Sequence, residues 1–165
     1  MSRKIKLILI TLVLILALDQ GTKVLVDRTI SLHHSIPVIE NFFNLTHIRN
    51  TGAAFGILAG QRGWFRTLFL ISFSLLAMGF IVVLLRRLPE SERVLTLALS
   101  FILGGATGNL IDRLLYGEVI DFLDFYWSNY HWPAFNVADS FITVGVGLTL
   151  IRIIQSKDKD PFAAE

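Results

Sequence analysis

Hydrophobic positions in this chain occur in long blocks, and most charged positions lie at or beyond the ends of those blocks. One block, residues 67–85, contains no charge and is followed directly by two arginines. A second block is apolar at first and then small and polar, and a third carries a single aspartate. A helix needs roughly 20 apolar residues to cross a bilayer. The pattern therefore predicts transmembrane helices over about 65–85, 94–113 and 135–154.

The N-terminal block is shorter, since only residues 7–18 are continuously apolar, and three basic residues precede it. That length and those charges are typical of a signal peptide. However, residues 17–20 do not make a small-residue cleavage site, and the apolar pattern resumes a few residues later. We therefore predict a retained helix over about 5–26, with Asp19 and Lys23 near its far end.

Four spans place both termini on one side of the membrane and leave two longer segments, 27–63 and 114–134, on the other. Residues 41–48 have the composition of a strand, so a small sheet is expected in the first segment. The second segment is rich in aromatic residues, which is typical of anchoring at the headgroup level. The predicted fold class is an all-α integral membrane protein. It would be a single membrane domain over 1–165, with four transmembrane helices and a small extracytoplasmic β-rich loop region.

The composition agrees with a membrane protein. The 165 residues are 53% hydrophobic and 17% charged, with no cysteine, whereas a soluble domain carries about 25% charged residues. These values argue against disordered, collagen-like and disulfide-stapled classes. The net charge of only +2 gives no argument for a nucleic-acid partner.

Lysine and arginine are unevenly divided between the two sides of this topology. Nine belong to the side of the termini and six to the other side, and residues 114–151 have none. Cytoplasmic segments carry an excess of these residues. Both termini are therefore predicted to be cytoplasmic.

Polar groups inside a span are functional candidates, because burying them in a bilayer is costly. Although helix direction alternates, all the candidates here map to the extracytoplasmic ends of the helices. Within each helix the candidates share a face: Asp19 with Lys23, Asn109 with Asp112 and Arg113, and Asn136 with Asp139. Asp121 follows the third span by eight residues.

Asp121 and Asp139 are the two candidates with no basic residue close by in the sequence. Hydrolysis of an amide requires a base that activates water and an acid that protonates the leaving nitrogen. Two close carboxylates that share one proton can fill both roles, because both cannot ionise in a poorly solvated site. The two could meet if the loop between them folds back, which the spacing alone does not establish.

The sequence also leaves open purely structural roles for several of these acidic residues. Asp19 and Lys23 could form a bridge within one helix, while Asp112 and Arg113 could form an interfacial pair. Asp121 could also be an ordinary loop carboxylate.

Other chemistries are less well supported by the sequence. It contains no HExxH or GxSxG motif, and its four histidines lack metal-ligand spacing, so we expect no metal and no cofactor. A Ser–Lys dyad would require Lys23 to lie near a serine such as Ser140. Gly104, Gly105 and Gly108 fall within a span, where they favour close helix packing.

Five segments together carry a family resemblance, and they cover most of the chain. They are Asp19-Gln20-Gly21-Thr22-Lys23; Arg49-Asn50-Thr51-Gly52-Ala53-Ala54-Phe55-Gly56; Gly104-Gly105-Ala106-Thr107-Gly108-Asn109-Leu110-Ile111-Asp112-Arg113; Val119-Ile120-Asp121-Phe122; and Phe135-Asn136-Val137-Ala138-Asp139-Ser140. In these segments, and in their order, the sequence resembles lipoprotein signal peptidase, also called signal peptidase II.

The resemblance implies an aspartic endopeptidase of the bacterial inner membrane with its active site at the extracytoplasmic leaflet. Its substrate would be a prolipoprotein that carries a diacylglyceryl cysteine, cut just before that cysteine. No protein partner and no nucleic acid would be required beyond the substrate and membrane lipids. Asp121 and Asp139 match the family's catalytic aspartates. The matching substrate-binding or supporting positions are Asp19, Lys23, Asn50, Asn109, Asp112, Arg113 and Asn136.

Two other classes of function use the same residues. In a small proton- or ion-coupled transporter the carboxylates would bind the ion, although such sites usually lie near the midplane and between internal repeats. No repeat is visible here, and the polar positions gather at one end of the spans. In an assembly or scaffold protein the carboxylates would serve only as packing pairs.

Overall fold

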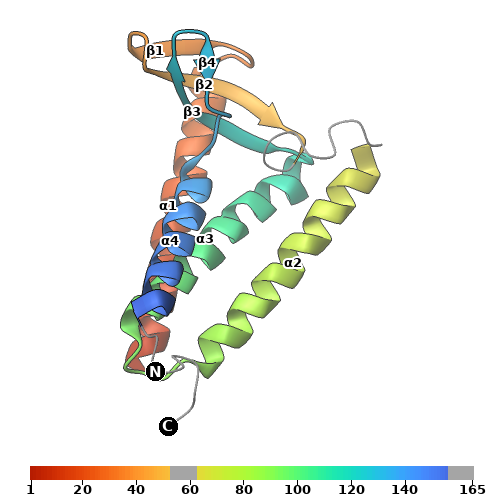
Figure 1. Cartoon of the computed structure of the whole chain (residues 1–165). Coiled ribbons are helices and arrows are strands. Elements are labelled where there is room, and N and C mark those ends of the chain that lie inside the picture. The colour runs from red at the N-terminus through yellow and green to blue at the C-terminus, as the bar shows by residue number, and fades with distance from the viewer. Residues whose placement is uncertain (53–62, 156–165) are drawn as a thin grey trace.

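The computed structural model describes residues 1–52 and 63–155, which form four long helices with a small sheet at one end (Figure 1). Each helix is long and apolar enough to cross a membrane. This arrangement confirms the predicted fold class. The helices are α1 (Arg3–Thr29), α2 (Gly63–Arg87), α3 (Arg93–Tyr116) and α4 (Val137–Gln155). The strands are β1 (Ser35–Ile39), β2 (Phe43–Asn50), β3 (Val119–Trp127) and β4 (Tyr130–His131).

The helix ends follow from local capping. The Ser2 hydroxyl accepts a hydrogen bond from the Ile5 N–H at 3.2 Å and begins α1. Gly117 ends α3 in a left-handed conformation, with φ 76°, and its N–H donates to the Arg113 carbonyl. The start of α4 lies two residues later than the predicted span, because the backbone of Phe135 pairs with Leu123 of β3.

The four strands form one antiparallel array in the order β1-β2-β3-β4. The predicted strand over 41–48 corresponds to β2. In contrast, β3 and β4 lie in the segment for which the sequence suggested only aromatic anchoring. The first four residues of β3 are all buried, so the strand lacks the polar–apolar alternation that reveals a half-exposed strand.

The helix α3 lies at the centre of the bundle and packs against α1, α2 and α4. Small residues allow this close approach. A Cβ added to Gly105 would lie 2.3 Å from the Ala138 carbonyl oxygen of α4, and one added to Gly104 would lie 2.9 Å from a methyl carbon of Ile15 in α1. The expectation that the glycines of this segment serve helix packing is confirmed at these positions.

The sheet docks on the end of α1 through an apolar cluster. Val26 and Ile30 of the α1 end pack with Ile120 and Phe122 of β3. Because side chains alternate across a strand, Asp121 between them points to the opposite side of β3. The docking of the sheet therefore fixes the direction of this carboxylate.

Candidate active site

Asp121 of β3 and Asp139 of the first turn of α4 line one cavity with a volume of about 560 Å³. The fold thus brings together the two carboxylates that the sequence singled out. The same cavity is lined by three of the supporting candidates, Asn50, Asn109 and Arg113. The other four candidates lie buried behind the cavity wall: Asp19, Lys23, Asp112 and Asn136.

Asp121 is almost fully buried and is held by two amide side chains. Asn50 donates to its Oδ2 at 2.9 Å, and Asn136 donates to its Oδ1 at 2.7 Å. Burial and, next, the neighbouring charge of Asp139 raise the pKa of Asp121 to about 7, against the opposing effect of the two hydrogen bonds. This carboxyl is therefore about half protonated at neutral pH and mostly protonated below it.

Asp139 takes part in the capping of α4. Its Oδ2 accepts the backbone N–H of Asn136 at 3.2 Å, while its own N–H donates to the side-chain oxygen of Asn136 at 3.0 Å. This reciprocal pair is a capping box. Asn109 donates to Oδ1 of Asp139 at 2.8 Å. These two N–H donors hold both oxygens of the carboxylate in place at the N-terminus of α4.

Neither cavity aspartate has a basic partner at ion-pair distance. None of the ion pairs within residues 1–52 and 63–155 includes Asp121 or Asp139. Arg113 lies on the cavity wall close enough to attract both carboxylates, and its Nη1 donates to the Asn109 carbonyl at 3.4 Å. The pair is therefore held by neutral donors, with the cation of Arg113 on the wall of the same cavity.

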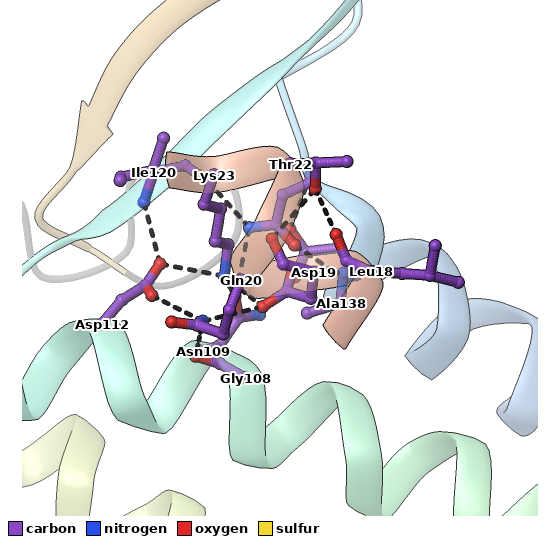
Figure 2. A network of polar contacts seen from close by, with 12 residues as sticks. Leu18, Asp19, Gln20, Thr22, Lys23, Gly108, Asn109, Asp112, Ile120 and Ala138 are labelled. Carbon is purple, nitrogen blue, oxygen red and sulfur yellow. Dashed lines mark hydrogen bonds and ion pairs between the residues drawn. The ribbon is translucent and has the colours of Figure 1, made fainter. Parts of the chain in front are cut away.

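Lys23 lies at the centre of a second polar cluster, behind the cavity (Figure 2). Its Nζ is 2.9 Å from Asp19, 2.9 Å from Asp112 and 3.0 Å from the side-chain oxygen of Asn109. Lys23 and both aspartates have side chains no more than 2% exposed. The predicted bridge to Asp19 is present. The alternative pairing of Asp112 with Arg113 is wrong, because the ion-pair partner of Asp112 is Lys23 on another helix.

The remaining bonds of this cluster tie four elements together. The Asp19 carboxylate accepts the Ala138 N–H of α4 at 2.9 Å, and that of Asp112 accepts the Ile120 N–H of β3 at 3.2 Å (Figure 2). Gln20 donates to both aspartates at 3.0 Å and to the Gly108 carbonyl at 3.2 Å. Gln20 belongs to the first of the five family segments but was not predicted to be a site residue.

Gly108 allows the Lys23 cluster to form. A Cβ at this position would lie 2.4 Å from Oδ2 of Asp19, closer than two non-bonded atoms can approach. The carboxylate of Asp19 therefore occupies the space that a side chain at 108 would need.

Asn109 connects the Lys23 cluster to the cavity. Its Oδ1 accepts hydrogen bonds from Lys23 and from Asn136, the latter at 3.1 Å. These donors fix the orientation of the amide, so its nitrogen must face Asp139. The buried cation thus acts on the catalytic candidate through one amide group.

The Ser–Lys alternative does not fit the geometry. The Ser140 hydroxyl donates to the Asn136 carbonyl at 3.0 Å, and the ammonium group of Lys23 is already surrounded by two carboxylates and an amide oxygen. Within residues 1–52 and 63–155, no group of three or more histidine, aspartate and glutamate side chains is arranged to hold a metal ion.

Several cavity residues were not identified from the sequence as candidates. Trp132, Pro133 and Phe135 form one wall, while Ile142 and Val144 extend the cavity along α4. They carry no chemistry of their own, so only the fold reveals them. Residues 53–56 of the second motif lie outside the described residues.

The comparisons with known proteins agree with this arrangement. The family model described as signal peptidase (SPase) II matches residues 11–155. A lipoprotein signal peptidase of Geobacter sulfurreducens is 53% identical over 142 residues, 86% of this chain and 88% of that protein. One of Syntrophus aciditrophicus is 49% identical over 157 residues, 95% of this chain and 98% of that protein. A solved bacterial membrane enzyme superimposes with a TM-score of 0.79 at 33% identity, covering 93% of this chain and 92% of the other.

Proposed function

The chain belongs to the signal peptidase II family, and we propose which of its residues carry out that family's reaction and on what form of substrate. As a member it is an aspartic endopeptidase that removes signal peptides from prolipoproteins, and a multi-pass protein of the bacterial inner membrane. The transporter alternative finds no support among its relatives, which are lipoprotein signal peptidases.

Asp121 and Asp139 are the catalytic pair in this proposal. The observation that carries it is their position in one cavity without an ion-pair partner, in contrast to the two aspartates behind them, which are paired with Lys23. The ionised Asp139 takes a proton from a water molecule, whose oxygen attacks the scissile carbonyl carbon. The protonated Asp121 gives its proton to the amide nitrogen as the carbon–nitrogen bond breaks. The pair again holds one proton, and the products are a carboxylic acid and an amine.

The neighbouring side chains hold the pair in this state. Asn50 and Asn136 position Asp121, while Asn109 and the N-terminus of α4 favour the negative charge on Asp139. Arg113 faces the same cavity and supplies positive charge where the tetrahedral intermediate becomes negative. Asp19, Lys23 and Asp112 take no part in proton transfer and position the helices and Asn109.

The substrate form that suits the cavity carries a diacylglyceryl group on its cysteine. The cavity continues from the carboxylates along α4 to Ile142 and Val144, and Val144 is exposed on the side of the helix that lipid would cover. An acyl chain can therefore remain in the apolar part of the membrane while the peptide bond reaches the aspartates.

The proposed orientation places the N-terminus of α1 and the end of α4 in the cytoplasm and the catalytic cavity at the extracytoplasmic leaflet. The positive-inside rule supports it, although Lys157 and Lys159, counted for the cytoplasmic side, lie outside the described residues. The sheet lies at the end of the bundle opposite the N-terminus (Figure 1), and its residues Asn50 and Asp121 line the cavity. A signal peptide inserted from the cytoplasm would present its C-terminal end at that level.

The experiment uses the purified full chain in lipid and a prolipoprotein precursor with and without diacylglyceryl modification. We expect cleavage of the modified precursor just before the cysteine, and at least tenfold slower cleavage of the unmodified one. Mass spectrometry of both products identifies the bond. No cleavage of either precursor would contradict the proposed activity, whereas equal rates would remove only the lipid requirement.

A further inference from the structure

A second cavity lies between the N-terminal ends of α1 and α3, at the end of the bundle opposite the catalytic cavity. Its volume is about 290 Å³, close to the lower limit of common small-molecule sites, about 300 Å³. The lining residues are Arg3, Lys4, Leu7, Glu90, Arg93 and Thr96. None of them has a part in the reaction described above.

The cavity carries a surplus of positive charge. Three cations and one carboxylate line it, which leaves a formal charge of +2. The ion pairs within the described parts of the chain include neither Arg3 nor Arg93. The nearby carboxylate of Glu92 does not neutralise them, because Arg152 holds it with two bonds of 2.6 and 3.0 Å.

The other two charged residues of the cavity, Lys4 and Glu90, already have local hydrogen-bond partners. Lys4 donates through its Nζ to the Leu88 carbonyl at 2.5 Å, and its backbone N–H donates to Glu90 at 3.2 Å. Glu90 therefore takes one of the free donors at the start of α1. Arg3 also attracts Glu90 but forms no ion pair with it, so the two arginines are the charged groups able to bind an anion from outside.

The cavity lies at the depth of lipid headgroups. Arg3 and Arg93 are the first residues of two membrane-spanning helices, while Leu7 lines the cavity one turn deeper. Val94, next to Arg93, is 52% exposed on a surface that lipid would cover. The cavity is thus lined mainly by charged groups, while apolar side chains, Leu7 inside it and the exposed Val94 beside it, lie next to them. A phosphate group that is attached to acyl chains meets both kinds of surface here.

We propose that this cavity binds the phosphate group of an anionic phospholipid, with Arg3 and Arg93 as its cationic partners. Arginine suits this role because its planar guanidinium donates two parallel hydrogen bonds to phosphate oxygens. Basic cavities between transmembrane helices are known to bind anionic headgroups. The occupant would hold the α1 and α3 ends together at the membrane surface. A soluble phosphate has the same charge but no acyl chains to lie against the exposed apolar surface beside the cavity.

The test measures binding to the full chain in a zwitterionic detergent by native mass spectrometry. The probes are short-chain phosphatidylglycerol, short-chain phosphatidylcholine and inorganic phosphate. We expect phosphatidylglycerol to bind at least tenfold more tightly than phosphatidylcholine. The double variant R3Q/R93Q should lose about fivefold in affinity for each arginine removed. Glu90→Gln should increase the affinity, because it removes the opposing charge.

The matched control is R86Q/R87Q, which removes two exposed arginines at the same end of the bundle but outside the cavity. Far-UV circular dichroism verifies that all variants remain folded. An unchanged preference in R3Q/R93Q, or an equal loss in R86Q/R87Q, would overturn the proposal. Full displacement of phosphatidylglycerol by a few millimolar inorganic phosphate would also overturn it, by assigning the cavity to a soluble anion. These results do not depend on the proteolytic reaction.

Discussion

Two pairs of aspartates lie near one another in this protein, and they differ in whether a cation is paired with them. Asp19 and Asp112 share the buried cation Lys23, with each carboxylate 2.9 Å from its ammonium group. Asp121 and Asp139 share only amide donors and an open cavity. The first pair is held in place by a buried ion-pair partner and is therefore structural, while the second pair has a proton available for chemistry. The same residue type thus serves two purposes according to whether a cation is buried beside it.

The largest expected effect separates the two pairs. Asp121→Asn and Asp139→Asn should each lower the cleavage rate by roughly 10²–10⁴-fold while the protein stays folded, because each loses a proton-transfer group. Asp112→Asn should instead reduce the yield of folded protein, because Lys23 loses a partner. Rate and melting temperature are measured for all three variants. Parent-like cleavage by either cavity variant would contradict the assignment.

The sequence predicted the first pair less well than the second. Helical spacing revealed the bridge between Asp19 and Lys23, but the second partner, Asp112, comes from α3, and no local rule connects helices that are far apart in sequence. Asp121 and Asp139 were identified as unpaired from sequence alone. Their meeting depends on the backbone pairing of β3 with Phe135, which fixes where α4 begins.

Some features of the structure could not be predicted from the sequence. The strand β3 is buried along its first half, so its sequence lacks the polar–apolar alternation from which a strand could have been predicted. Gln20 occurs in a recognised motif, yet its three acceptors lie on two helices, and only packing reveals them. The helices were easier to predict, because apolar length alone reports a span.

Removal of the central cation should have the next largest effect. Lys23→Met leaves two buried carboxylates facing each other, and breaking a buried ion pair costs about 3–5 kcal/mol. The free energy of unfolding, measured by denaturation in mixed micelles, should fall by about this amount. Lys6→Met on the exposed face of α1 is the control and should change little. An equal loss in both variants would show that the Lys23 cluster has no special role.

A smaller loss of stability is expected when a side chain is added at the helix contact that leaves room for the Lys23 cluster. Gly108→Ala places a methyl group 2.4 Å from the Asp19 carboxylate, and overpacking of this kind costs about 1–3 kcal/mol. The control is Gly79→Ala in α2, where nothing lies within 4 Å of the new atom. Melting temperatures of the two variants compare them directly. A G108A protein as stable as G79A would mean that the two helices can move apart freely.

The smallest expected effect is a shift in the pH dependence of kcat/KM. The acid form of Asp121 is required, and its pKa is raised to about 7, so kcat/KM should fall as pH increases above about 7. The hydrogen bond from Asn50 lowers this pKa. Asn50→Ala should therefore raise it and move the descending limb to higher pH, whatever happens to the maximum rate. A limb that stays in place or moves to lower pH would contradict this assignment.

The central claim is that Asp121 can hold the proton that the reaction requires, because its pKa is raised to about 7. Infrared spectroscopy of the purified protein measures this through the C=O stretch of protonated carboxyl groups, recorded at about pH 6 and about pH 9 around the pKa. We predict one buried carboxyl band at the lower pH that disappears at the higher pH, is absent from Asp121→Asn, and is retained in Asp27→Asn. A band that persists in Asp121→Asn, or no band in the parent protein, would contradict the account.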